Sequence, residues 1–223
     1  MYASLLVRNG LKLFKMIKTM SKCIEIKDKE QRKALNLWAH HKFHGSIIAG
    51  TGFGKTRVGV LAIGKMLEYY PDDNALVLVP TTQLQDQFKD EFIKWGYEEI
   101  LDKVDIQCYQ SAYKFKNKEY RVVVADEVHL GLSKQHYKFF ENNKYDKLLC
   151  LTATIPEDLD YRAKLEELAP IVYRLKLDDC VKLGLVSPYE IHCMAVDLTE
   201  EEKAEYKKAN NMFVHYKYKL GQF

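Results

Sequence analysis

The chain has 223 residues, of which 47% are hydrophobic and 29% are charged, and its formal net charge is +3 at pH 7. This length suits one well-packed domain with an appendage, and the apolar content excludes a largely disordered chain. No apolar run approaches the roughly 20 residues that a membrane span requires, and the slight positive charge gives no argument for nucleic-acid binding by itself.

The five cysteines form no C-x-x-C pair. Cys108 and Cys150 lie within apolar, strand-like runs, where they are expected to be buried thiols. Free thiols are typical of reducing compartments, so the sequence predicts a cytoplasmic protein.

The first 20 residues are basic and contain no acidic residue. Leucines and Phe14 separate their charges, a pattern that suits an organelle-targeting peptide or a surface amphipathic helix. An upstream start codon explains the segment equally well, because Met16 and Met20 are alternative starts. Residues 1–24 are therefore treated as an extension without an assigned function.

Helix-like and strand-like segments alternate after residue 25. In chain order, the pattern predicts a helix at 30–41, a strand at 46–49, a helix at 55–70 ended by Pro71, a strand at 75–79, a helix at 81–95, strands at 104–108, 121–125 and 147–151, and a helix at 156–169. Threonines can cap the helix at 81–95, and a proline and acids open the helix at 156–169.

The predicted strands are apolar throughout and are separated by helices. This favours the α/β class, a parallel β-sheet with helices on both faces, over residues 25–178. Beyond residue 178 the pattern offers one strand at 189–196 and one charged helix from 199 to about 212, so residues 179–223 are expected to be a linker and the start of another domain. In parallel sheets ligands bind beyond the carboxyl ends of the strands. Segments with hydroxyl or charged side chains follow four of the predicted strands, at 50–56, 80–82, 126–129 and 152–154.

The segment AGTGFGKT at residues 49–56 predicts a phosphate-binding loop for ATP and Mg²⁺. Its glycines let backbone N–H groups converge on phosphate oxygens, at the positive end of the helix that follows. The strict pattern begins with glycine where this chain has Ala49, which is a mild departure. A plain glycine turn is disfavoured by the strand before and the helix after. The candidate nucleotide-binding residues are Gly50, Thr51, Gly52, Phe53, Gly54, Lys55 and Thr56.

Two adjacent carboxylates end the buried strand RVVVADEVH at residues 121–129. Asp126 is placed to hold Mg²⁺, together with the Thr56 hydroxyl, and Glu127 could orient and deprotonate an attacking water. Such a pair could also cap the next helix, but its combination with the phosphate loop favours catalysis by Lys55, Asp126 and Glu127. A glutamate beside the metal ligand indicates hydrolysis rather than transfer to an acceptor.

Four segments in this order resemble the superfamily 2 helicases and translocases of the D-E-x-H type. AGTGFGKT resembles motif I, VPTTQLQDQF (79–88) motif Ia, DEVH (126–129) motif II and LTAT (151–154) motif III; CYQSA (108–112) is similar to a further segment near the bound strand. The likeness covers about residues 28–196 and implies a RecA-like ATP-binding domain over 25–178. LGLVSPYEI (183–191) and DLTEEEKAEY (197–206) resemble the group of type III restriction helicase subunits and duplex-DNA translocases.

The resemblance implies further roles, residue by residue. It assigns coupling between the nucleotide and the nucleic-acid path to His129, Thr152 and Thr154, and contacts with the nucleic-acid backbone to Pro80, Thr81, Thr82, Gln110 and Ser111. Backbone contacts of this kind suit a translocase because they do not depend on base sequence. Gln31 matches the upstream glutamine that reads adenine, although an exposed helical glutamine is the alternative.

The resemblance also implies a second RecA-like domain that supplies arginines to the transferring phosphoryl group. Residues 175–223 contain no arginine, so the sequence leads us to expect that this second half is absent from the chain. We therefore expect weak ATP·Mg binding, very slow hydrolysis and no unwinding of duplexes, unless a second domain or chain acts in trans. DNA is favoured over RNA as the nucleic acid.

Three alternatives remain beside this interpretation: an ATP-driven protein remodeller, an inactive or regulatory nucleic-acid-binding fragment, and a disfavoured small-molecule kinase. Two clusters were weighed as additional sites. Histidines 40, 41 and 44 have no cysteine or carboxylate at ligand spacing nearby, which argues against a metal site. The aromatic residues Tyr113, Phe115 and Tyr120 among lysines could form a stacking patch, but a solvated loop edge is the more common outcome.

Overall fold

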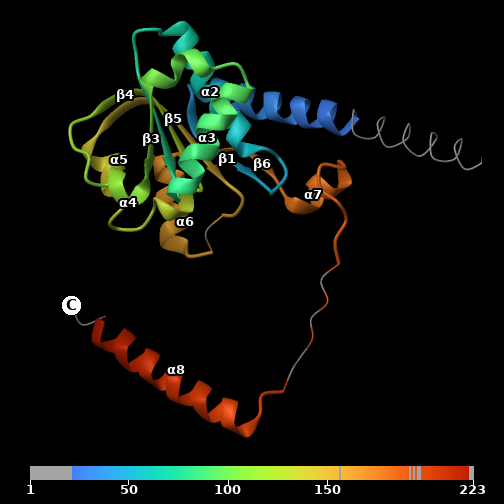
Figure 1. Cartoon of the computed structure of the whole chain (residues 1–223), viewed down its shortest axis with the longest axis vertical. Coiled ribbons are helices and arrows are strands. Elements are labelled where there is room, and N and C mark those ends of the chain that lie inside the picture. Colours follow the sequence, from blue (N-terminus) through green and yellow to red (C-terminus); the bar gives the residue numbers. More distant parts are fainter. Residues whose placement is uncertain (1–21, 156, 191, 193, 195–196, 221–223) are drawn as a thin grey trace, which may run out of the picture. The chain divides into compact units, whose positions relative to one another are not determined.

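A computed structural model describes residues 22–155, 157–190, 192, 194 and 197–220, with the side chains of 217–220 excepted. The chain forms two compact units, divided between Ser187 and Pro188. The first unit contains the sheet and the candidate site, and the second contains one long helix (Figure 1).

The first unit is built on a six-stranded sheet in which every neighbouring pair is parallel. In sheet order the strands are β3 (Val104–Cys108), β2 (Ala75–Val79), β4 (Glu119–Asp126), β5 (Lys144–Thr152), β1 (His44–Ala49) and β6 (Ile171–Leu175). The predicted α/β class and parallel sheet are thereby confirmed.

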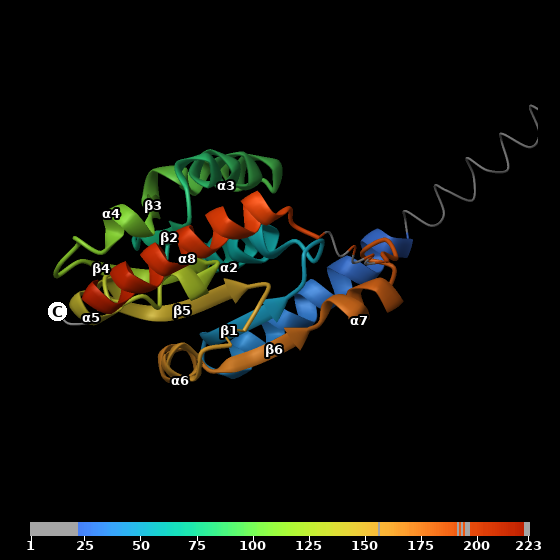
Figure 2. The same ribbon diagram turned by 90° about the horizontal axis from the view of Figure 1, so that it is seen from below.

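Helices connect the strands and cover both faces of the sheet. They are the helix of residues 22–40, α2 (Lys55–Tyr69), α3 (Thr82–Lys94), α4 (Tyr109–Ala112), α5 (Lys138–Asn142), α6 (Leu159–Leu168) and α7 (Leu177–Lys182), with 3₁₀ turns η1 (Glu98–Lys103) and η2 (Val128–Leu130). Figure 2 shows α2 and α3 on one face of the sheet and α6 on the other.

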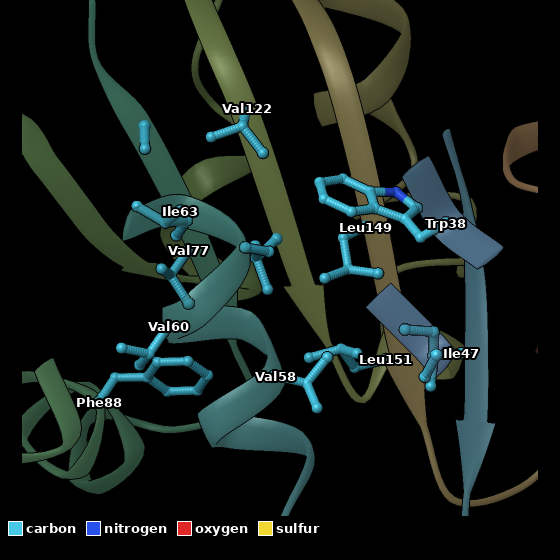
Figure 3. Close-up of a cluster of buried hydrophobic side chains, with 14 of the residues drawn as sticks. Trp38, Ile47, Val58, Val60, Ile63, Val77, Phe88, Val122, Leu149 and Leu151 are labelled. Atoms are coloured by element: carbon cyan, nitrogen blue, oxygen red, sulfur yellow. The ribbon is translucent and has the colours of Figure 1, made fainter. Parts of the chain in front are cut away.

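The four inner strands contribute side chains to two separate cores, because successive residues of a strand point to opposite faces. In β2, Val77 packs with α2 and α3, whereas Leu76 and Leu78 pack on the opposite side with α5 and α6. Figure 3 shows the first of these cores, in which Trp38 lies near Leu149. The Trp38 indole also donates to the Leu148 carbonyl at 2.9 Å, which ties the helix of residues 22–40 to β5.

Most predicted strands are confirmed, and the differences lie mainly in the helices and at the sheet edge. The first helix already includes residues 22–29, ahead of its predicted start at 30. The helix predicted at 156–169 begins at Leu159, because the Asp158 carboxylate caps it by accepting from the backbone N–H groups of Asp160 and Tyr161; Pro156 lies outside the described residues. The edge strand β6 was not predicted.

The second unit contains α8 (Glu200–Leu220), which is longer than the predicted helix. Thr199 begins it with a capping box: the Thr199 hydroxyl accepts from Glu202 N at 3.3 Å, and Glu202 accepts from Thr199 N at 2.8 Å. The strand predicted at 189–196 is wrong at residues 189, 190, 192 and 194, which are not in a strand, and its other positions are outside the described residues. Among the helices that the structure describes, none combines the length and apolar character needed to cross a membrane.

Candidate active site

The loop between β1 and α2 is fixed to the protein at both ends. Gly50 N donates to the Leu175 carbonyl of β6 at 3.2 Å, and the Phe53 ring is fully buried, 5.7 Å from the ring of Tyr173. Gly54 precedes the helix with φ of 84°, in the left-handed region where a side chain is strained. Thr51 and Gly52 are exposed between these anchors, so the loop presents its backbone outward.

The Lys55 side chain bridges the ends of two strands that are not neighbours in the sheet. Its Nζ lies 3.3 Å from the Ala49 carbonyl of β1 and 3.4 Å from Glu127 Oε1 beyond β4. Only 11% of the side chain is exposed, so this ammonium group is directed into the space between the two loops. Thr56 follows in the first turn of α2 and is half-buried.

Asp126 and Glu127 differ in their surroundings although they are adjacent. Asp126 ends β4 and is only 6% exposed, and burial, with a smaller contribution from the Glu127 charge, raises its pKa from 3.8 to about 6. The ammonium of Lys55 opposes this increase in the pKa. Glu127 is more exposed and has φ of 46°, a left-handed conformation that is costly for a side chain other than glycine. The chain therefore maintains a buried, destabilised carboxyl group beside a strained residue.

Replacing Asp126 with asparagine is expected to stabilise the nucleotide-free chain against unfolding at pH 8. The raised pKa means that the folded chain binds this proton more tightly than the unfolded chain does, so the ionised carboxylate destabilises the fold above about pH 6. The gain should be on the order of 3 kcal/mol at pH 8 and should disappear as pH falls below 3.8. Urea unfolding in EDTA at pH 8 and pH 4 measures it.

Asp72→Asn is the matched control, because Asp72 is exposed and the substitution removes the same charge. An equal gain for Asp126→Asn at both pH values would show that the stabilisation does not come from ionisation.

The hydroxyl of Thr152 connects the segments that follow β4 and β5. Its Oγ1 lies 3.1 Å from Glu127 Oε2 and 3.1 Å from the Thr154 carbonyl, and its single proton can serve one acceptor at a time. His129 Nδ1 is 3.1 Å from the same oxygen and 3.5 Å from Glu127 Oε2. Glu127 therefore contacts His129 and Thr152, whereas Thr154 joins this cluster through its backbone and its side chain makes none of these contacts.

Gln31 is 1% exposed, which rules out the alternative of an exposed helical glutamine. Its Nε2 donates to the Phe53 carbonyl at 2.6 Å, and its Oε1 accepts from Arg57 at 2.6 Å. The structure therefore brings Gln31 directly against the phosphate loop.

The residues predicted to contact nucleic acid form a separate group, in which Pro80 is half-buried and the other four are exposed. Thr81 precedes α3 as its cap residue without a side-chain cap hydrogen bond, and Thr82 is the first residue of that helix. Gln110 Nε2 donates to the Pro80 carbonyl at 3.2 Å, which joins α4 to this edge, and Ser111 is exposed beside it. None of these five residues has a described contact with Lys55, Asp126 or Glu127.

Tyr109 links the two groups and was not predicted. Its side chain is 1% exposed, and its hydroxyl donates to the Asp126 carbonyl at 2.9 Å. Its position in the segment CYQSA, next to Gln110, was the only sequence signal.

The structure gives packing or hydrogen-bonding roles to residues of the two additional clusters. No group of histidine, cysteine and carboxylate residues there has the arrangement of a metal site. His44 Nε2 instead lies 2.7 Å from the Leu168 carbonyl. Tyr120 is 5% exposed and Phe115 packs against the second core, so these two rings are used for packing.

A sequence model of the family described as "Type III restriction enzyme, res subunit" matches residues 24–157, more than half of the chain. The chain belongs to this family. The matched region, residues 24–157, includes the phosphate loop, Asp126, Glu127 and Thr152. The described site therefore lies within the region that defines the res subunit family.

Helicases are among the known proteins that this chain resembles in sequence or in fold. A protein of African swine fever virus named as an ATP-dependent RNA helicase is 30% identical over 155 residues, and the alignment covers 58% of this chain and 28% of the relative. The fold resembles the UvsW helicase of bacteriophage T4 (TM-score 0.50, 16% identity, 65% of this chain and 57% of that one). It also resembles S. cerevisiae Dbp5 bound to RNA and ADP BeF3 (TM-score 0.53, 17% identity, 67% and 46%). At these identities the structures show the RecA-like fold alone.

Proposed function

We propose that this chain is the ATP-binding half of a nucleic-acid helicase or translocase that hydrolyses ATP. The observation that carries this proposal is the approach of Lys55 Nζ to Glu127 Oε1, 3.4 Å apart, beside the buried carboxyl group of Asp126. A cation from the phosphate loop and two carboxylates thus converge where ligands bind in parallel sheets. Membership of the res subunit family supports the same function.

The donor set fits ATP with Mg²⁺. The exposed backbone of residues 50–54 receives the phosphates, Lys55 approaches the β- and γ-phosphates, and Thr56 with Asp126 holds the metal. Asp126 suits a divalent cation because it is a buried carboxyl group whose charge Lys55 alone offsets only in part. When bound, Mg²⁺ would neutralise part of the phosphate charge. Glu127 orients the attacking water and accepts its proton.

Hydrogen bonds suggest how the site communicates with the nucleic acid. Thr152 and His129 contact Glu127, so a change at the γ-phosphate can reach both loops. Tyr109 joins the Asp126 backbone to α4, where Gln110 and Ser111 are exposed. In this proposal the exposed groups of Pro80, Thr81, Thr82, Gln110 and Ser111 contact the phosphate backbone.

A complete motor requires more than the described site. The chain spans 28% of the viral relative's length, and residues 175–223 contain no arginine to stabilise the transferring phosphoryl group. We propose that a second RecA-like domain, or a partner chain, supplies this arginine. Purified alone, the 223-residue chain should bind ATP·Mg, hydrolyse it slowly and unwind no duplex.

Calorimetric titration with ATP·Mg, followed by an ATPase assay with and without DNA or RNA, tests the function. ATP·Mg binding is the expected result, and its absence would refute the proposal. We propose DNA as the nucleic acid; the name of the viral relative makes RNA the necessary comparison. Binding of neither nucleic acid would favour a protein remodeller, and nucleic-acid binding without any turnover would favour a regulatory fragment.

Replacing Thr81 with aspartate is expected to weaken nucleic-acid binding about tenfold. Thr81 is exposed at the start of α3, so a carboxylate there would repel a backbone phosphate and compete for the N–H groups of the helix. Fluorescence anisotropy with labelled single-stranded and duplex DNA and RNA measures the change. Gln87→Asp adds the same charge at an exposed position of the same helix and should have a small effect. Equal losses in the two variants would mean that Thr81 makes no specific contact.

A further inference from the structure

A polar cluster lies behind the phosphate loop, between the helix of residues 22–40 and α2. At its centre Arg57 Nη1 donates to Gln31 Oε1 at 2.6 Å, and Arg57 Nη2 donates to Asp28 Oδ1 at 2.8 Å. The guanidinium group also lies over the Trp95 ring, 4.1 Å from its centroid. Helix 22–40 and the end of α3 therefore fix the position of this arginine side chain of α2.

Arg57 determines which way the Gln31 amide faces. A guanidinium group only donates, so the side that faces Arg57 must be the amide oxygen. The amide nitrogen is thereby directed at the phosphate loop, where it donates to the Phe53 carbonyl at 2.6 Å and to the Gly54 carbonyl at 3.3 Å. A reversed amide would place its oxygen against these two carbonyl oxygens and against no donor.

Gln31 contacts the loop at Gly54, one of the two loop glycines with a left-handed backbone. Gly54 has φ of 84°, and a Cβ atom built on it would lie 2.6 Å from Gln31 Nε2. The left-handed turn therefore packs directly on the Gln31 amide. Because the carbonyl groups of Phe53 and Gly54 are held from behind, their peptide planes, and with them the neighbouring N–H groups, are fixed in orientation.

The arginine is retained here although one of its donors is not satisfied. Arg57 Nε is buried and has no hydrogen-bond partner among the described residues. A buried donor without a partner opposes folding, so the contacts with Asp28, Gln31 and Trp95 must outweigh its cost. Anchoring helix 22–40 alone would not need a guanidinium group directed at a glutamine.

We propose that Arg57 is a positioning residue for phosphate binding, which acts by orienting the Gln31 amide and so preorganising the loop at Phe53 and Gly54. This inference rests on the proposed ATP site. It assigns Gln31 to the phosphate loop rather than to the nucleotide base, since both amide N–H groups are used by loop carbonyls. Removing the cluster should then weaken the binding of every ligand that carries the polyphosphate, whatever its base.

Binding of three ligands separates this role from base recognition. We expect Arg57→Ala to weaken the binding of Mg²⁺-bound ATP, GTP and inorganic tripolyphosphate by a similar factor, about tenfold. This is the size expected when one or two hydrogen bonds that hold the loop are lost. Arg57→Lys, which retains one donor for Gln31, should recover part of the loss. Arg32→Ala is the matched control, because the Arg32 side chain also pairs with Asp28, at 2.7 Å, but has no described hydrogen bond with the Gln31 side chain. A loss confined to ATP would overturn the proposal in favour of base recognition.

A double-mutant cycle and hydrogen exchange test the route through Gln31. Gln31→Ala should reduce binding like Arg57→Ala, and the double variant should lose no more than either one; additive losses would overturn the proposal. In the nucleotide-free chain, exchange at the amides of residues 52–55 should accelerate in Arg57→Ala and stay unchanged in Arg32→Ala. Unchanged exchange would overturn the inference even if ATP binds, whereas faster exchange in a chain that never binds ATP would refute only the proposed function.

Discussion

Replacing Lys55 with alanine is expected to weaken ATP·Mg binding by about 100-fold, the size expected for losing charge-assisted hydrogen bonds to phosphate. The Lys55 ammonium is 11% exposed and is directed between the phosphate loop and Glu127. No other lysine or arginine of the described site faces this space, since Arg57 points away to Gln31 and Asp28. Calorimetric titration with a non-hydrolysable ATP analogue and Mg²⁺ measures the loss.

Lys65→Ala on the same helix is the control. Lys65 is 63% exposed and pairs with Glu68 at 2.7 Å, so its removal deletes the same charge from α2 away from the loop. Circular dichroism should show that both variants are folded. Unchanged affinity in Lys55→Ala would contradict the assignment of the phosphate site.

The sequence predicted the sheet well because its inner strands are continuous apolar runs. The bounds of the inner strand β2 agree with prediction, because ALVLV is buried at every position. The bounds of β3 also agree although it is an edge strand, because VDIQC alternates buried apolar residues with polar ones, which is the other pattern typical of a strand. The edge strand β6 was missed because IVYRL contains an exposed arginine and two half-buried residues. As an edge strand, β6 pairs only with β1 and is not buried throughout, so it lacks the continuous apolar run by which inner strands are recognised.

The candidate site was predictable to the extent that topology brings strand ends together. Lys55 and Glu127 follow β1 and β4, Thr152 ends β5, and parallel pairing gathers the carboxyl ends of these strands on one side of the sheet. The contacts of Arg57 with Gln31 and of Tyr109 with Asp126 were not predictable, because they join residues 26 and 17 positions apart through side-chain orientation. Gln31 shows the same limit: its motif pointed to a ligand, but its burial depends on how helix 22–40 packs.

Replacing Glu127 with glutamine is expected to lower ATP turnover by about 10²–10⁴-fold, the range typical of removing a general base. Binding should be retained, because glutamine keeps the shape of the side chain and removes a negative charge from the place where the γ-phosphate is expected. Single-turnover hydrolysis, with the chain in excess over labelled ATP, measures the rate even if it is slow.

The control for Glu127→Gln is the same substitution at Glu119, which begins β4 whereas Glu127 follows its end. Glu119 is 70% exposed and pairs with Lys144, so neither binding nor turnover should change in Glu119→Gln. A Glu127→Gln chain with normal turnover would exclude Glu127 as the base. Loss of both binding and turnover would instead mean that the bridge to Lys55, rather than proton transfer, is the main contribution of Glu127, because the amide cannot hold the ammonium as the carboxylate does.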